Sequence, residues 1–543
     1  MLSRLLIKHM SNMSSSDSYY IGIDLSTQAL KVIVIDHYLH LVSEVCIRYS
    51  EDLPHFGTSE GFLKENDTVT TPVKMWIEAL DLALERLSSL VDLKRVAGIG
   101  GCAQQHGTVY TKQGFLSSLK SLDSSVPLSF QLGTQFTIPN SPIWMDNSTN
   151  EYCKHMEESF GGPTPLSHHT GSRAHTRFSA HQIYKVLNET PNKYHSTERI
   201  LLISNFVGTL FAGNYMAIDL SDGSGMNLLD IFNKKWIPEL CTLYDDVDIS
   251  EKIGNPVPTV QDPKENSVLI SPYFVKRYDF SPECKIGSFT GDNPATLVGM
   301  FLNSNDMVLS LGTSDVLISV AEHVKPSPDI HVFCNPLNSD NHMFIICYKN
   351  GSLVREKLKD DYCSGSWDKY NEILVDMPIN PELVGNYFLQ PEICPAGLAG
   401  AISSSYKCSL LSMMPAAIVR TVTEGQFLSK LCDIECAGFI SSHSSRLIVV
   451  GGGSVNTAIL SIVSDIFGMD VYRTEYTNIA ARGGAYLAFS SVNGIQALKD
   501  VIIDNAPKLN LVCHPDEENH KMYIEMKHKY AVVQEEALAK ISE

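Results

Sequence analysis

Three segments of the chain share one arrangement, in which an apolar run is followed at once by small and hydroxyl-bearing residues. Apolar, largely β-branched runs flank short polar turns at 19–36 and at 306–320, and each pattern predicts a β-hairpin. At 447–467 an apolar run ends in three glycines, and a pattern of helical period follows. This third segment predicts a buried strand that leads into a helix.

The residues at these turns suit an anion. Small residues let backbone N–H groups approach a charged oxygen closely, and Ser and Thr hydroxyls add donors without bulk. One such hairpin alone is usually structural. Two hairpins of matching design, about 290 residues apart, suggest two related halves that face one ligand, and phosphate is the ligand that suits them.

The segment GSFTGDNPATLVGM at 287–300 allows two interpretations. Asp292 or Asn293 could cap a helix that Pro294 opens at its first position, because Asp, Asn and Pro favour those places. Alternatively, Asp292 is held at a helix N-terminus where its carboxylate can accept a proton. These interpretations are compatible, since a cap would also fix the direction of the carboxylate.

Composition narrows the classes of partner. The chain has 543 residues and a formal charge of −19, which favours two to four domains and makes nucleic acid an unlikely ligand. No apolar stretch approaches the length of about 20 residues that a membrane span needs. An acidic protein that binds an anion such as ATP needs local help from loops, Mg²⁺ or a few basic side chains.

The cysteines and the N-terminal residues 1–18 indicate the cellular compartment of the protein. Thirteen cysteines are scattered without a CxxC pair, which indicates reduced thiols in a cytoplasmic protein and makes a zinc site a poor alternative. Residues 1–18 are basic and rich in Ser, so a short transit peptide is an alternative, but we expect a flexible N-terminal extension.

Familiar phosphate-binding signatures are missing. The sequence contains no GxxxxGK[ST], HRD, DFG, GxGxxG or HExxH motif, which excludes the P-loop, protein-kinase, simplest dinucleotide-binding and zincin interpretations. If this chain binds ATP, it does so with another architecture.

Taken together, the motifs resemble a known family. The DxSTxxxK hairpin, the Gly-Thr-Ser hairpin and the Gly-Gly-Gly-Ser turn are similar to the two phosphate loops and the adenosine loop of the α/β, two-domain actin/hexokinase/Hsp70-like (ribonuclease H-like) fold. Within that fold, the chain from about 19 to 500 resembles the FGGY carbohydrate kinases. Five segments resemble the branch that phosphorylates D-xylulose: GGCAQQHGTVY (100–110), SPIWMDNST (141–149), GSRAHTRFS (171–179), SDGSGMNLLD (221–230) and FTGDNPATL (289–297).

The resemblance implies a domain plan. A sugar-binding domain would span 19–301 and a nucleotide-binding domain 302–500, with an interdomain cleft that closes on substrate and a polar helical tail at 501–543. Residues 390–415 match no motif of the family. The expected protein is a monomer or homodimer that uses ATP and Mg²⁺.

On the sugar side, the resemblance implies that Asp292 is the general base for the attacking hydroxyl. His106 would donate a hydrogen bond to the sugar, and Trp144 would belong to the core. The other implied sugar-binding residues are Asn293, Arg177, less surely Arg173, Met145 and Asp146.

On the nucleotide side, Asp24 would position Mg²⁺, which typically takes only one or two protein carboxylates. Trp367 would stack on adenine. The implied phosphate ligands are Ser26, Thr27, Lys31, Gly312, Thr313 and Ser314, and the implied adenosine ligands are Gly451, Gly452 and Asn456.

The implied reaction is ATP-dependent phosphorylation of D-xylulose to D-xylulose 5-phosphate. One alternative is an FGGY kinase for another ketose or polyol, such as ribulose or glycerol, because a few hydroxyl contacts decide sugar choice. A remote alternative is a sensor that binds sugar or nucleotide without catalysis; the presence of Asp24 and Asp292 argues against it.

Overall fold

The computed structural model describes most of the chain, as two compact units. The described residues are 17–244, 247–265, 268–304, 306–404, 410–439, 445–505 and 508–542. Unit 1 comprises Met1–Phe301, Phe333–Asp340 and Thr477–Ala506. Unit 2 comprises Leu302–Val332, Asn341–Tyr476 and Pro507–Glu543. The expected extension at 1–18 lies almost wholly outside the described residues.

The units differ from the contiguous ranges expected from the sequence. A boundary does fall between Phe301 and Leu302, but two later segments, Phe333–Asp340 and Thr477–Ala506, return to unit 1. The physical reason is packing, because the helix at 479–493 covers the sheet of unit 1.

Unit 1 is built on a five-stranded sheet of order β13-β6-β1-β2-β3. Its strands are β1 (Tyr19–Leu25), β2 (Ala29–Ile35), β3 (Leu41–Arg48), β6 (Val96–Ala103) and β13 (Lys285–Gly291). β1 and β2 form the predicted antiparallel hairpin, whereas β1, β6 and β13 run parallel. The apolar side chains of β1 and β2 are almost fully buried, which explains their near-continuous hydrophobic sequence.

Helices cover this sheet closely. The larger helices of unit 1 are α3 (Val73–Ser88), α6 (Asn150–Ser159), α8 (Ser179–Glu189), α10 (Ile203–Ala212), α15 (Asp292–Met300), α20 (Ile479–Asn493) and α21 (Ile495–Asn505). A Cβ added at Gly22 of β1 would lie 2.0 Å from the carbonyl oxygen of Ala481 in α20. Glycine is therefore required at position 22 by the close approach of the helix.

Unit 2 contains a seven-stranded sheet of order β16-β17-β15-β14-β20-β21-β22. Its strands are β14 (Met307–Leu311), β15 (Asp315–Ala321), β16 (His331–Cys334), β17 (His342–Tyr348), β20 (Arg446–Val450), β21 (Asp470–Thr474) and β22 (Leu509–Cys513). β14 and β15 form the second predicted hairpin, and β20 runs parallel to β14. A short 3₁₀ turn, η6 (Gly452–Val455), joins β20 to the predicted helix.

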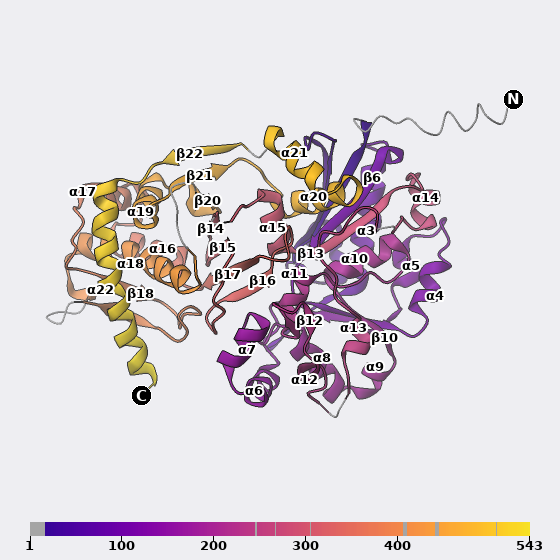
Figure 1. Cartoon of the computed structure of the whole chain (residues 1–543), viewed down its shortest axis with the longest axis horizontal. Helices are drawn as coiled ribbons and strands as arrows, with labels where there is room; N and C mark the ends of the chain where they lie inside the picture. Colours follow the sequence, from indigo (N-terminus) through magenta and orange to yellow (C-terminus); the bar gives the residue numbers. More distant parts are fainter. Residues whose placement is uncertain are drawn as a thin grey trace. The chain divides into compact units, whose positions relative to one another are not determined.

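The helices of unit 2 include the C-terminal one. They are α16 (Ser352–Tyr362), α17 (Trp367–Asp376), α18 (Pro415–Cys436), α19 (Thr457–Phe467) and α22 (Glu517–Ser542). α22, yellow in Figure 1, packs against α18 and α19. Because Tyr523, Met526 and Tyr530 of α22 are completely buried, the C-terminal residues form part of the core of unit 2.

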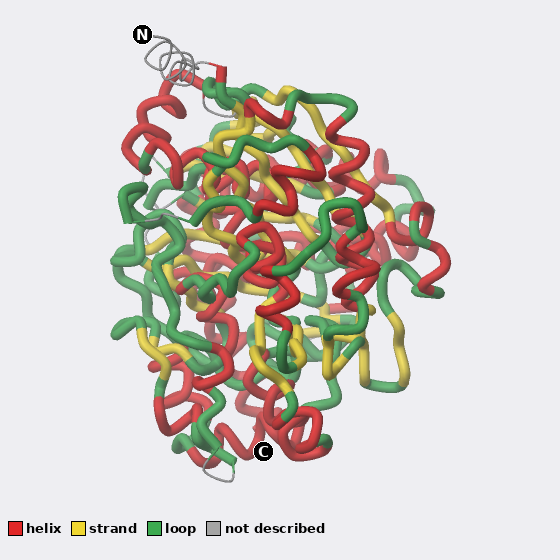
Figure 2. Tube along the Cα trace, turned by 90° about the vertical axis from the view of Figure 1, so that its right-hand side faces the viewer, coloured by secondary structure: helices red, strands yellow, loops and turns green. Residues whose placement is uncertain are grey.

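The secondary structure is of the α/β class. Figure 2 shows the strands in yellow among the helices in red. Within the part of the chain that the structure describes, no helix is both long and apolar enough to cross a membrane. The described cysteines are free thiols, and most of them are buried.

Candidate active site

The functional residues of unit 1 meet at one edge of its sheet because three parallel strands end there in register. Leu25 of β1 is paired with Ala103 of β6, and Ala103 is paired with Gly291 of β13. The segments that follow these three ends are 26–28, 104–107 and the start of α15. Ligand sites in α/β sheets are commonly found at the carboxyl ends of parallel strands.

Asp292 is the first residue of α15, so the possible role of Asp292 or Asn293 as the helix cap is wrong. The helix does not begin at Pro294; it begins directly after Gly291, whose extended backbone (ψ 158°) ends β13. The Asp292 Oδ1 atom accepts bonds from the backbone N–H of Asn293 (2.9 Å) and from its side-chain Nδ2 (3.2 Å). The carboxylate is thus oriented by the next residue and does not cap the helix.

The environment of Asp292 disfavours its charge. Burial raises the pKa of Asp292 from 3.8 to about 7, and the negative charge of Asp24 adds to the rise. The side chain is half-buried, so solvent screens part of this effect. A carboxylate with a pKa near neutrality is well matched to accept and release a proton.

Asp24, at the end of β1, is almost fully buried and lightly paired. Its Oδ1 atom accepts a bond from Ser26 Oγ (2.7 Å), and Lys31 Nζ lies 3.4 Å from Oδ2. The Cys102 thiol lies 3.8 Å from Oδ1. Lys31 faces Asp24 because the two are register partners across the β1–β2 hairpin.

The turn of this hairpin is tied to its neighbours by Thr27. Thr27 Oγ1 donates to Gln104 Oε1 (3.1 Å) and accepts from Trp144 Nε1 (3.0 Å). Trp144 is 43% exposed, so its assignment to the core is wrong. Its indole needs a polar partner, and Thr27 supplies one.

His106 has a strained backbone and a defined tautomer. Its φ of +72° lies in the left-handed region, which is uncommon for a residue other than glycine and often occurs at functional sites. Burial lowers the pKa of His106 to about 3, with a further contribution from Arg177, so the ring is neutral. Nδ1–H donates to the carbonyl of Gly225 (2.9 Å), which leaves Nε2 as an acceptor and corrects the expected donor role.

The two candidate arginines have different neighbours. Arg173 forms a two-pronged ion pair with Glu157, with distances of 3.1 Å from Nε to Oε1 and 3.2 Å from Nη2 to Oε2. The Arg177 guanidinium lies 5.8 Å from the ring of Phe178, which in turn packs on His106. Arg177 therefore lies, through Phe178, next to the candidate sugar ligand His106.

The Asp146 carboxylate has a structural role, because it accepts hydrogen bonds from several segments of unit 1. Its buried carboxylate accepts bonds from Val69 N (2.9 Å), Ser148 N (2.9 Å) and Gln182 Nε2 (2.8 Å), and also from the Ser148 hydroxyl. These donors come from three separate segments, so Asp146 joins them. Met145 beside it is partly buried and packs against the main core of unit 1.

A pair of buried acids, Asp219 and Asp222, was missed by sequence reasoning. Burial raises the pKa of both, and the charge of Asp219 raises that of Asp222 further. Asp222 accepts bonds from Gln105 Nε2 (3.4 Å) and Ser204 Oγ (2.5 Å). The segment SDGSG was among those that resemble the family, but only the fold shows that it contacts Gln105 and His106.

In unit 2, the turn of the second hairpin is exposed and lies above a buried ionic cluster. Thr313 and Ser314 are exposed, whereas Asp315 is completely buried. The Arg355 nitrogens lie 2.8 and 3.0 Å from the Asp315 carboxylate oxygens, and Lys430 Nζ lies 3.2 Å away. Burial alone would raise the pKa of Asp315, but the two cations hold it below its usual value.

The glycine turn of unit 2 lies beside this hairpin. Gly451 has a φ of +84°, and a Cβ there would lie 2.8 Å from the carbonyl oxygen of Leu311, so both conformation and space require glycine. Gly452 is exposed, and a Cβ added there would meet no atom within 4 Å. Parallel strands β14 and β20 therefore present the 312–314 turn and the glycine turn at one edge.

Asn456 links the glycine turn to α17. Its Oδ1 accepts a bond from the N–H of Ile459 (3.2 Å), which caps α19, and its Nδ2 donates to Asn371 Oδ1 (2.8 Å). Hydrogen bonds at both the oxygen and the nitrogen therefore fix the orientation of the Asn456 side-chain amide.

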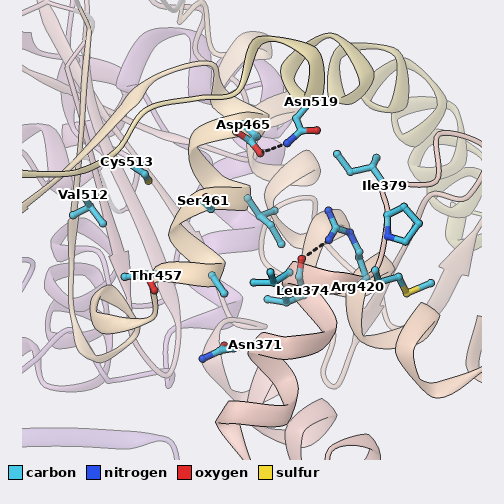
Figure 3. Close-up of a pocket in the computed structure, with 15 residues that line it drawn as sticks. Asn371, Leu374, Ile379, Arg420, Thr457, Ser461, Asp465, Val512, Cys513 and Asn519 are labelled. Carbon is cyan, nitrogen blue, oxygen red and sulfur yellow. Dashed lines mark hydrogen bonds between the residues drawn. The ribbon is translucent and has the colours of Figure 1, made fainter.

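A pocket of about 630 Å³ opens beside Asn371. In Figure 3, Thr457, Ser461 and Asp465 follow one side of α19, and Leu374 and Arg420 lie opposite. Trp367 is one helical turn before Asn371 on α17 and is 38% exposed. An exposed tryptophan on the helix that lines this pocket is available for a planar ligand.

No preformed metal cage is present in the described part of the chain. There, no group of three or more His, Cys, Asp or Glu side chains could hold a metal ion. Asp24 fits Mg²⁺ in another way, because it is one carboxylate at a site where phosphate oxygens and water would supply the remaining ligands.

Two α/β units, each with a hairpin turn of small residues at the edge of a mixed sheet, define the class of actin-like ATPase folds. A crystal structure of a xyloylose kinase from Brucella ovis matches 96% of this chain and 99% of its own, with a TM-score of 0.77 and 18% identity. Plasmodium falciparum glycerol kinase with ADP matches 95% of this chain and 98% of its own (TM-score 0.69, 16% identity).

Within that class, the chain belongs to the FGGY family of carbohydrate kinases. The model of the family's N-terminal domain matches residues 135–299, and that of its C-terminal domain matches 307–492. Rat xylulose kinase is 39% identical over 96% of this chain and 97% of its own length. Xylulose kinase 2 of Arabidopsis thaliana is 37% identical over 87% of each.

Proposed function

We propose that the protein transfers the γ-phosphoryl group of ATP to D-xylulose, giving D-xylulose 5-phosphate and ADP. The observation that carries this proposal is Asp292, a half-buried carboxyl group with a pKa of about 7 at the start of α15, in a chain of this family. Near full-length identity of 37–39% to proteins named xylulose kinase supports the choice of sugar.

Asp292 acts as the general base. Both bonds from Asn293 go to Oδ1, so we assign Oδ2 to the attacking hydroxyl. As the sugar C5 oxygen bonds to the γ-phosphorus, the bond to the β-phosphate oxygen breaks, ADP leaves, and the hydroxyl proton passes to Asp292. Positioning and charge neutralisation supply most of the rate in such transfers.

The sugar is held by neutral and cationic groups around this base. We assign the Nε2 lone pair of His106 to accept a hydrogen bond from a sugar hydroxyl, and Arg177 and Asn293 to further hydroxyl contacts. Met145 lines the apolar side. Asp146 supports the pocket from behind, because protein donors surround its carboxylate.

Asp24 would hold Mg²⁺, with Ser26, Thr27 and Lys31 on phosphate oxygens. When bound, Mg²⁺ would neutralise charge that develops on the transferred phosphate. Ser26 and Lys31 orient the Asp24 carboxylate through their bonds to its two oxygens.

Unit 2 would hold the rest of the nucleotide. The backbone N–H groups of Gly312, Thr313 and Ser314 face phosphate in this proposal, and Gly451 and Gly452 admit adenosine without side-chain obstruction. Asn456 holds the adenosine end through the orientation that Asn371 gives it. Trp367 stacks on the base, which enters the 630 Å³ pocket lined by Asn371 and Thr457.

The free thiols agree with a reducing compartment, and we propose a cytoplasmic enzyme that acts as a monomer or homodimer. A second candidate substrate is another ketose or a polyol, because glycerol kinase shares this fold.

The test is release of ADP with ATP, Mg²⁺ and a panel of D-xylulose, D-ribulose, L-ribulose, L-xylulose and glycerol. The expected result is strong turnover of D-xylulose alone. Asp292→Asn should reduce kcat by about 10³-fold, within the range for loss of a general base. Asp279→Asn is the matched control, since Asp279 is a 74% exposed carboxylate of the same unit.

Each alternative has its own outcome in this assay. Turnover of a different sugar would keep the kinase and replace its substrate. If correctly folded wild-type protein turned over none of these sugars, the proposed function would be wrong.

A further inference from the structure

The segment SDGSGM, at 221–226, contacts the proposed sugar ligand His106 and its neighbour Gln105, although it holds no proposed sugar ligand itself. It forms most of α11 (Leu220–Gly223) and all of η4 (Ser224–Met226), and it is buried. The carbonyl of Gly225 fixes the tautomer of His106. The carboxylate of Asp222, one turn earlier, contacts Gln105.

From Asp222, a chain of hydrogen bonds leads to the proposed base. Gln105 Nε2 donates to Asp222 Oδ1 (3.4 Å), and Gln105 Oε1 accepts from Asn293 Nδ2 (2.9 Å). Asn293 Nδ2 also donates to Asp292 Oδ1 (3.2 Å). Two side-chain amides therefore lie between two carboxyl groups.

The direction of this chain is set by its ends. Oδ1 of Asp222 faces Gln105 and accepts a hydrogen bond whether or not the carboxyl group carries a proton on Oδ2, beside Ser204. Gln105 therefore turns its NH₂ group toward Asp222 and its carbonyl toward Asn293. Asn293 must then turn its own NH₂ group toward Gln105 and Asp292. The Asn293 carbonyl oxygen is left to accept a hydrogen bond.

The parts of this chain are held tightly. Gln105 lies against Gly291, where an added Cβ would come within 2.7 Å of Nε2. Ser204 Oγ donates to Asp222 Oδ2, and Asp222 is only 2% exposed. Asp219 accepts the backbone N–H groups of Ser221 and Asp222, which fixes the short helix that carries Asp222.

We propose that Asp222 is a positioning residue that sets the direction of the Gln105–Asn293 amide relay. Through this relay, Asn293 presents its carbonyl oxygen to a hydroxyl of the sugar beside Asp292. The proposal rests on the proposed sugar kinase activity and extends it to a residue that makes no contact with either substrate.

The test compares two replacements of Asp222. Asp222→Leu removes every acceptor, whereas Asp222→Asn keeps a carbonyl that can accept from Gln105. Asp222→Leu should lower kcat/KM for the sugar about 30-fold and leave the KM for ATP within twofold. Asp222→Asn should stay within threefold of wild type for both substrates.

Two controls separate positioning from general damage. Gln105→Leu breaks the relay at its centre, so adding Asp222→Leu to it should cost no further activity. Thr259→Val removes a bond to the neighbouring Asp219 without touching Gln105, and it should leave sugar kcat/KM within twofold. Multiplicative losses in the double variant, or an equal loss with Asp222→Asn, would overturn the proposal.

Failure of the proposed function would be recognised separately. A thermal unfolding cycle on the same Asp222 and Gln105 variants measures their contact whether or not any sugar is turned over. If wild type is active but the cycle shows no coupling in either stability or sugar kcat/KM, the proposed relay is wrong and the proposed kinase activity is retained. If wild type is inactive and the stability cycle shows coupling, the contact stands but its assignment to sugar fails with the function.

Discussion

Each of the two hairpins has a buried aspartate next to its turn, and the two aspartates have different roles. In unit 1, Asp24 precedes the turn, and its ionic partner among the described residues is Lys31, which lies 3.4 Å away and is one-third exposed. In unit 2, Asp315 follows the turn and is enclosed by Arg355 and Lys430. A carboxylate with spare acceptor capacity can bind a cation, and one saturated by two cations can only hold the structure together.

The surrounding charges extend this contrast. Besides Asp24, unit 1 brings Asp292, Asp222 and Asp219 to one region, and the pKa of each of these three is raised. In unit 2, Asp315 has a lowered pKa. The charged forms of these acids in unit 1 are therefore destabilised, as is common at functional sites. In unit 2, the charged form of Asp315 is stabilised.

The largest expected effect is on the paired acid. Asp315→Asn leaves Arg355 and Lys430 buried without a carboxylate, and it should lower the free energy of unfolding by about 3–5 kcal/mol. Denaturant unfolding measures this loss. Asp361→Asn on α16, in an exposed pair with Lys357, should cost about 0.5 kcal/mol or less. Equal losses in the two variants would remove the distinction between the hairpins.

A smaller effect is expected at Asp24, and in catalysis rather than stability. Asp24→Asn should lower kcat about 100-fold, or about 2.7 kcal/mol in the activation barrier, because an amide holds Mg²⁺ more weakly than a carboxylate. ADP release measured across Mg²⁺ concentrations would show it. Asp36→Asn, at the other end of β2, should retain full activity; an unchanged kcat in Asp24→Asn would contradict the assigned role.

The smallest effect concerns the cost of keeping Asp292 ionised. Its pKa is 3.8 when unperturbed and about 7 in the folded state, so folding favours its proton and this group destabilises the fold as pH rises from about 4 to 7. Asp292→Asn should therefore increase the unfolding free energy by about 1 kcal/mol at pH 8, allowing for solvent screening. The gain should shrink toward zero at pH 4.

Thermal unfolding of wild type and Asp292→Asn across that pH range measures the difference. A constant difference between pH 4 and 8 would mean that its cause is not the titration of Asp292. The same pKa implies that wild-type kcat/KM falls below about pH 7, where the base becomes protonated.

Local patterns in the sequence were enough to predict the strands and turns that carry the site. Both hairpins and the strand-to-helix segment at 447–467 form as predicted, because alternating apolar runs, glycine and small polar residues determine local conformation directly. The resemblance added the residues at their ends, and the register of β1, β6 and β13 explains why Asp24, Gln104 and Asp292 lie at one edge.

Long-range contacts could not be predicted in this way. The expected core position of Trp144 is wrong, since its indole N–H donates to Thr27, 117 positions away in the sequence. The roles of Asp222 and the tautomer of His106 depend on bonds that join segments more than 100 residues apart. No periodicity records such contacts.

The return of the chain to unit 1 at Thr477–Ala506 has a consequence for synthesis. The sheet that carries Asp24 and Asp292 is covered by α20, against which Gly22 packs directly. On the ribosome, β1 and β2 therefore emerge long before the helix that buries them. Until residue 506 has been translated, the nascent chain holds an apolar sheet face without its cover, and this is the interval in which molecular chaperones would protect it.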